Sequence, residues 1–171
     1  MFTSFSGAVL VAGGSGITFA LSVVQDLIQQ NLKGRSRVKI IELVWTVRDP
    51  ESARPFMPLL VSLIEQSVYT PVHVSIHYTR AMSARAKRPL LLLQHPALTL
   101  TAGRPRVQKV LDAAIWQTVS LGGGKKDGQR VGGVVVGVCG PAALGDDVNR
   151  AVGMISPARR DQVGGIEVYE E

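Results

Sequence analysis

The sequence predicts an α/β fold, namely a doubly wound, Rossmann-like parallel sheet of about five strands with helices on both faces. Apolar, β-branched stretches of strand length alternate along the chain with longer stretches of helical period. This alternation is typical of βαβ units, whose crossovers make the sheet parallel. The chain has 171 residues, of which 46% are hydrophobic, enough for a single domain over 1–171 with a sizeable core.

The first unit spans residues 8–28 and contains a strand (8–12), a glycine turn and a helix. In the helix, apolar residues recur at three- and four-residue steps: Ile17, Ala20, Leu21, Val24 and Ile28. The turn is Gly13-Gly14-Ser15-Gly16, where glycines admit positive φ and close approach of a ligand. Free N–H groups at the helix start suit a phosphate, and Ser15 and Thr18 add hydroxyl groups.

This turn predicts a site for a nucleotide pyrophosphate, with an ordinary glycine turn as the alternative. The spacing does not follow the strict G-x-G-x-x-G fingerprint of dinucleotide-binding proteins. Residues 1–25 carry no charge, as in a signal peptide or membrane span. The glycines interrupt the apolar run, however, and no basic segment precedes it, so we exclude both.

The middle of the chain predicts two further units. A strand over 38–47, with Trp45 in the core, ends at Arg48-Asp49-Pro50. Asp49 or Ser52 then caps a helix that runs to about Gln66 and contains the apolar residues Leu59, Leu60, Leu63 and Ile64. A strand over 72–78 ends at Thr79-Arg80, an irregular stretch covers 81–97, and a short strand follows over 98–101.

The last third predicts two helices and two strands. A helix over 106–121 precedes a glycine- and lysine-rich stretch, 122–130, that we expect to be a flexible loop. A strand over 131–138 ends at Cys139-Gly140-Pro141. A helix from about 143 to 155 then carries Asp146 and Asp147, which we expect in its first turn, and a strand over 166–169 closes the chain.

In a doubly wound sheet, ligands bind at the carboxyl ends of the strands. Glycines, three arginines and a thiol are expected there: Gly13-Gly14-Ser15-Gly16, Arg48, Thr79-Arg80, Gly103-Arg104 and Cys139-Gly140. Three arginines exceed what a pyrophosphate needs, which favours the additional 2′-phosphate of NADPH. Arg48 directly follows the second strand, where an acidic residue would favour NAD.

The composition narrows the classes of partner. A net charge of +6 favours anionic partners, but 5% aromatic residues and no nucleic-acid-binding motif argue against DNA or RNA. The single cysteine, Cys139, excludes an intrachain disulfide and indicates a reducing compartment. We predict no metal site, because His73 and His77 share a strand face without an acidic or cysteine ligand at suitable spacing.

Four motifs in order resemble the NAD(P)-binding domain of the ferric reductase and NADPH oxidase superfamily, a ferredoxin-NADP reductase-like domain. They are Gly13-Gly-Ser-Gly-Ile17-Thr18, Val44-Trp45-Thr-Val-Arg48-Asp49, Gly103-Arg104-Pro105 and Val138-Cys139-Gly140-Pro141. Together they cover nearly the whole chain, and the sequence as a whole is most similar to that of a fungal ferric reductase.

The resemblance implies a role for each motif. Gly13, Gly14, Ser15, Gly16, Ile17 and Thr18 would hold the pyrophosphate and ribose, and Arg48, Thr79, Arg80 and Arg104 would surround the adenosine and its 2′-phosphate. Cys139, Gly140 and Pro141 would lie by the nicotinamide, with the Cys139 thiol near the path of hydride transfer. In the family, NADPH passes a hydride to FAD, and electrons then cross the membrane through haem.

The resemblance also implies a larger parent protein. Neither a flavin-binding barrel nor membrane helices are present, so we expect a fragment whose partner is the FAD-binding domain of the same parent, on the cytosolic face of a membrane. Alone, the fragment would bind NADP(H) without completing electron transfer.

The alternatives to this function are the same domain of a superoxide-producing NADPH oxidase, and an interaction or regulatory domain that has kept the fold and lost the ligand. Structural alternatives to the implied site roles also stay open: Cys139 could be an ordinary buried cysteine, and Arg80 and Arg104 could be solvated surface arginines.

Overall fold

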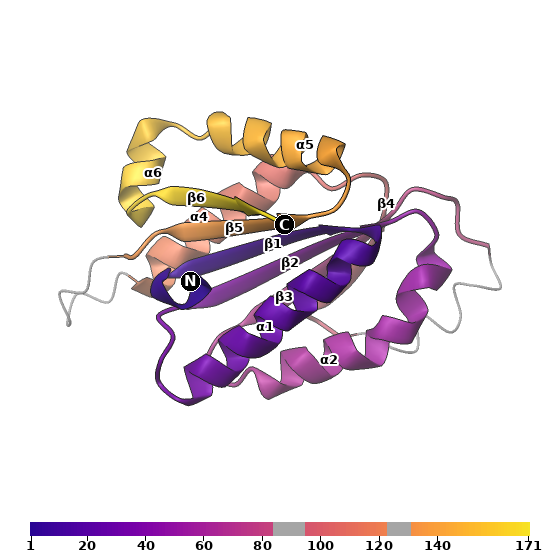
Figure 1. The fold of residues 1–171 in the computed structure, drawn as a ribbon, viewed down its shortest axis with the longest axis horizontal. Helices are drawn as coiled ribbons and strands as arrows, with labels where there is room; N and C mark the ends of the chain where they lie inside the picture. The colour runs from indigo at the N-terminus through magenta and orange to yellow at the C-terminus, as the bar shows by residue number, and fades with distance from the viewer. Residues whose placement is uncertain (84–94, 123–130) are drawn as a thin grey trace.

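Six parallel strands form the central sheet of the computed structural model, in the order β4-β3-β2-β1-β5-β6 (Figure 1). The structure describes residues 1–83, 95–122 and 131–171. The strands are β1 (Gly7–Gly13), β2 (Ile40–Val47), β3 (Val72–Tyr78), β4 (Leu98–Ala102), β5 (Val134–Cys139) and β6 (Ile166–Glu170). The doubly wound class is confirmed, with one strand more than the predicted count of about five.

The position of each strand explains its sequence. β1 lies between β2 and β5, and all seven of its residues are buried, as expected for a strand covered on both faces. β3 alternates between buried and half-buried residues, and β4 and β6, at the two edges, are largely exposed. The apolar pattern therefore weakens from the centre of the sheet to its edges.

Two helices cover one face of the sheet. They are α1 (Ile17–Leu32) and α2 (Met57–Gln66), the latter preceded by a 3-10 segment, η3 (Pro50–Phe56). The predicted apolar positions of α1 are all buried, and Leu27 joins them. In α2, Leu60 and Leu63 are buried, whereas Leu59 is 38% exposed. Asp49 caps η3 by accepting a hydrogen bond from the Glu51 backbone N–H (3.1 Å), as predicted.

Three helices cover the opposite face: α4 (Val107–Gly122), α5 (Ala142–Gly153) and α6 (Pro157–Val163). Figure 1 shows them on the side of the sheet away from α1 and α2. α6 was not predicted. α5 begins at Ala142, so Asp146 and Asp147 lie in its second turn. The sequence-based expectation that they lie in the first turn is wrong.

Two predicted segments fall largely outside the described residues. The irregular stretch over 81–97 includes 84–94, and the flexible loop over 122–130 includes 123–130. Among the described helices, none has the length and apolar character needed to cross a bilayer.

Candidate nucleotide site

A pocket of about 460 Å³ opens at the carboxyl edge of the sheet. Its volume lies within the range of small-molecule sites. It is lined by residues at the carboxyl ends of five of the six strands or in the segments that follow them: Gly13, Gly14, Thr46, Val47, Arg48, Thr79, Arg104, Pro105, Val107, Pro141, Ala143, Leu144 and Asp147. The chain runs from β1 towards β4 on one side and continues with β5 on the other side of β1, so the pocket lies where the strand order reverses.

The glycine turn forms one wall of the pocket. Gly14 has φ +54°, which favours glycine, and a Cβ added there would have nothing within 4 Å. The turn therefore leaves open space above its backbone. The indole N–H of Trp45 donates a hydrogen bond to the Gly14 carbonyl oxygen (2.9 Å), and Trp45 itself is 2% exposed. Through this hydrogen bond, β2 fixes the orientation of the glycine turn.

The start of α1 packs directly against the end of β5. A Cβ at Gly16 would lie 2.1 Å from the Cys139 carbonyl oxygen and 3.1 Å from its Sγ. Gly16 is therefore the point at which α1 and β5 approach closely enough to exclude a side chain, and it is buried. Ile17 is 1% exposed, and its side chain belongs to the core. Thr18 Oγ1 donates to the Ser15 carbonyl oxygen (3.1 Å).

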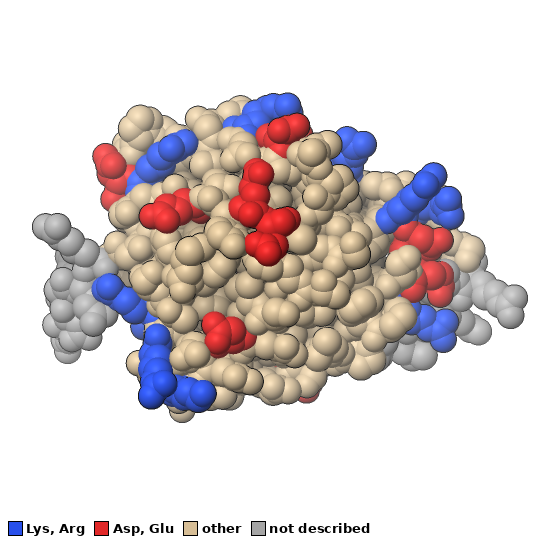
Figure 2. Space-filling view, in the orientation of Figure 1, with Lys and Arg blue, Asp and Glu red and all other residues tan. Residues whose placement is uncertain are grey.

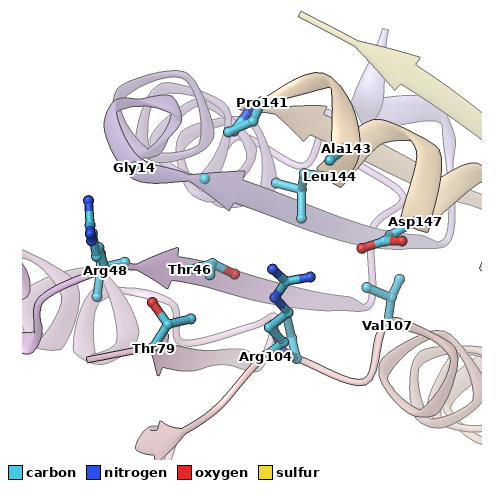
Figure 3. Close-up of a pocket in the computed structure, with 13 residues that line it drawn as sticks. Gly14, Thr46, Arg48, Thr79, Arg104, Val107, Pro141, Ala143, Leu144 and Asp147 are labelled. Carbon is cyan, nitrogen blue, oxygen red and sulfur yellow. The ribbon is translucent and has the colours of Figure 1, made fainter. Parts of the chain in front are cut away.

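The predicted arginines divide into two groups. Arg48 and Arg104 line the pocket with Thr79, and neither has an ion-pair or hydrogen-bond partner for its guanidinium among the described residues. Figure 3 shows the Arg104 guanidinium reaching across the pocket towards α5, with Arg48 at the other end. Arg80 does not line the pocket, because its guanidinium is paired with Asp49 (3.5 Å).

The remaining predicted residues lie at the margin of the pocket. Pro141 lines it, whereas Cys139 and Gly140 do not. Cys139 is half-buried at the end of β5, beside Gly16. The structure thus brings together Gly13, Gly14, Arg48, Thr79, Arg104 and Pro141, and leaves Ser15, Gly16, Ile17, Thr18, Arg80, Cys139 and Gly140 outside the lining.

The wall formed by α5 was not predicted from the sequence. Ala143, Leu144 and Asp147 of that helix face the pocket, and Figure 3 shows the Asp147 carboxylate pointing into it. Asp147 also forms an ion pair with Arg150 (3.2 Å), which offsets part of its charge. The predicted site residues follow strand ends, and α5 was not considered as a wall. The spacing of Pro141, Leu144 and Asp147 at three-residue steps is the pattern that could have revealed this face.

The floor of the pocket contains an unsatisfied polar group. Thr46 Oγ1 is buried and has no hydrogen-bond partner among the described residues, and the same holds for Nδ1 of its register neighbour His77. Burial lowers the pKa of His77, while a hydrogen bond with the Gly103 backbone opposes this change. Buried polar atoms without partners are uncommon, and Thr46 offers its hydroxyl to a ligand in the pocket.

Nearer the amino ends of the strands, Glu42 and His73 form a separate pair (2.8 Å). Burial raises the pKa of the Glu42 carboxyl, and the contact with His73 acts in the opposite direction. Within the described ranges, no group of three or more His, Cys, Asp or Glu side chains is arranged to hold a metal ion.

Comparison with known families identifies one match. The family described as "Ferric reductase NAD binding domain" matches residues 5–153, which include the whole pocket. No curated protein matches the chain.

Proposed function

The chain belongs to the ferric reductase NAD-binding domain family, an oxidoreductase family that binds a nicotinamide cofactor, and from this premise we propose that it is the NADPH-binding domain of a transmembrane ferric reductase. In this proposal the domain lies on the cytosolic face of the membrane. It presents NADPH to an FAD-binding domain of the same parent, from which electrons pass through haem to ferric iron.

The observation that carries the proposal is the pairing of a glycine turn with two unpartnered arginines across one pocket. Gly14 offers open backbone at the start of a helix, where N–H groups and the helix dipole favour a pyrophosphate. Arg48 and Arg104 supply two guanidinium groups, the side chains best suited to bind a phosphate through paired hydrogen bonds. A dinucleotide with a further phosphate fits both features.

The described residues fit the adenosine part of such a ligand. Thr46 and Thr79 offer hydroxyl groups, and Pro105, Val107 and Leu144 provide the apolar surface on which an adenosine can pack. Bound there, the cofactor would supply a hydride from its nicotinamide. The residues of this chain would bind and orient it, with Cys139 and Gly140 beyond the Pro141 wall, on the side where the nicotinamide would extend.

Calorimetric titration of the chain with NADP+ and with NAD+ tests the proposal. We expect NADP+ to bind more tightly. Arg48→Ala and Arg104→Ala should each weaken NADP+ binding by about 10- to 100-fold, the loss typical of a hydrogen bond to a charged group, and change NAD+ binding little. Arg106→Ala is the matched control, because Arg106 is exposed and lies two residues beyond Arg104 but outside the pocket lining.

Two results would contradict parts of the proposal. A preference for NAD+ would overturn the assignment of the arginines to a 2′-phosphate while leaving the fold and the dinucleotide site. No binding of either nucleotide, with the chain alone and again with a flavin-binding domain supplied, would overturn nucleotide binding and favour an interaction or regulatory domain.

A further inference from the structure

Asp147 is the one acidic residue among the described residues that line the pocket of the candidate nucleotide site. Figure 3 shows its carboxylate pointing into the pocket, where Arg48 and Arg104 supply two positive charges. A carboxylate repels the phosphates that these arginines are suited to bind. Its place on the pocket wall is therefore favourable only if the ligand offers it a hydrogen-bond donor.

The two oxygens of the Asp147 carboxylate have different surroundings. Oδ1 accepts a hydrogen bond from Arg150 Nη1 (3.2 Å), three residues further along α5. Oδ2 has no hydrogen-bond or ion-pair partner in the described part of the chain, and Arg104, which reaches from the opposite wall, does not pair with it. Arg150 thus holds one oxygen, and the other is free to accept a hydrogen bond from a ligand.

Apolar side chains lie beside this carboxylate. Pro105, Val107 and Asp147 line both the pocket and a groove between α4 and α5, so they share the end of the pocket that adjoins this groove. Leu144 lies one turn before Asp147 on the same face of α5, and Figure 3 shows Gly14 away from them, towards the other end of the pocket. A planar base can pack on this apolar surface, with its edge towards the carboxylate.

We propose that Asp147 recognises adenine, by accepting a hydrogen bond from the exocyclic amine of the base at Oδ2. This inference rests on the proposed function, since it assigns the base of the same nucleotide. The adenosine part of NADPH has two donors, this amine and the ribose 3′-hydroxyl. The 3′-hydroxyl lies next to the 2′-phosphate, which repels the carboxylate. The amine lies at the far side of the base, so Asp147 can bind it without meeting the phosphate.

This contact makes Asp147 a residue that determines base specificity. Hypoxanthine carries a carbonyl oxygen in place of the amine, so the carboxylate would face an acceptor and lose its hydrogen bond. A hydrogen bond to a charged group typically contributes a factor of ten or more to affinity. Because the side chain of Asp147 is 48% exposed and water competes for the amine, we expect the lower end of this range, about ten-fold.

Calorimetric titration of the 171-residue chain with NADP+ and with nicotinamide hypoxanthine dinucleotide phosphate tests the proposal. The two ligands differ only in the base, and we expect the wild type to bind NADP+ about ten-fold more tightly. In Asp147→Asn the ratio of the two affinities should fall to about one, because the amide can accept from adenine or donate to hypoxanthine. The ratio is the readout, since loss of the charge affects both phosphorylated ligands alike.

Asp146→Asn is the matched control. Asp146 precedes Asp147 on α5, is exposed, and lies outside the pocket lining. Figure 2 shows acidic and basic side chains close together along α5, so either substitution removes one charge from the same mixed surface. Asp146→Asn should keep the ten-fold preference of the wild type for NADP+. NAD+ and its hypoxanthine analogue should give the same ratio, so the test does not depend on the assignment of the 2′-phosphate.

Two results would overturn the recognition of adenine and leave the proposed nucleotide site in place. One is equal affinity of the wild type for the adenine and hypoxanthine ligands. The other is a preference for adenine that persists undiminished in Asp147→Asn, because another group would then contact the base. A failure of the proposed function gives a different result, namely no binding of any of these nucleotides by the chain alone or with a flavin-binding domain supplied, and this inference would fail with it.

Discussion

Trp45 is the residue that connects the core to the candidate site. Its indole ring is buried in β2 and packs edge-on against Phe56 of η3 (5.2 Å between centroids). Its N–H holds the Gly14 carbonyl oxygen, which orients the peptide units that face the pocket. From the sequence, Trp45 is predicted only as a core residue, because a hydrogen bond between a side chain and a backbone group 31 residues away leaves no pattern in the sequence.

Removing this hydrogen bond should affect ligand binding more than folding. Trp45→Phe keeps an aromatic ring and removes the N–H donor. We expect a loss of about 1–3 kcal/mol in the free energy of unfolding, from the lost hydrogen bond and the smaller ring, measured by chemical denaturation. We also expect NADP+ affinity to fall about ten-fold, because the turn is no longer fixed.

Phe56→Leu serves as the control for this experiment. It weakens the ring contact but leaves the Trp45 donor in place, so it should lower stability while preserving NADP+ affinity. If both variants lose the same affinity at matched stability, the hydrogen bond does not position the turn.

We expect His77 to make the stability of the folded chain depend on pH. Because burial lowers the pKa of His77 from its ordinary value of 6.5, the unfolded chain binds a proton more readily than the folded chain. The resulting stability is present above pH 6.5 and is lost as the pH falls from there through the folded pKa. His77→Gln should therefore show a smaller fall in melting temperature on acidification than the wild type. Parallel melting curves across this range would mean that His77 does not contribute.

At the scale of elements, the packing of α1 against β5 depends on Gly16. Gly16→Ala places a methyl group against the Cys139 carbonyl oxygen, a rigid backbone atom, so the helix must move away from the strand. We expect a loss of about 3 kcal/mol in the free energy of unfolding. Gly14→Ala, two residues earlier, meets no atom and costs only the strain of its positive φ, about 1 kcal/mol.

Chemical denaturation of the two variants distinguishes packing from backbone strain. If Gly16→Ala proves no more destabilising than Gly14→Ala, the close approach of α1 to β5 does not limit stability. The comparison also bears on the site, since the same contact places Cys139 beside the start of α1.

Most elements of the fold could be predicted from the sequence, because strong periodicity marks them. The apolar steps of α1 and the alternation in β3 both appear in the sequence as they do in the structure. α6 could not be predicted, because its seven residues bury only Val163 and so show no helical period. The predicted start of α5 is one residue late, which moves Asp146 into the first turn. Asp147 is the fifth residue even from that start, so its expected place in the first turn was wrong with either start.

The candidate site could be predicted where it depends on topology. Parallel strands bring their carboxyl ends to one edge, which is why Gly13, Arg48, Thr79 and Arg104 come together as expected. Side-chain directions could not be derived in this way. The pairing of Arg80 with Asp49, across the ends of two strands, removes from the pocket an arginine that the sequence analysis had included.

At the scale of the whole molecule, the parallel sheet confines the candidate site to one edge. The glycine turn and its arginines all lie at the carboxyl ends of the strands. Core clusters pack on both faces of the sheet and support this edge. A rigid core of this kind transmits little change from one end to the other unless an element has two alternative arrangements.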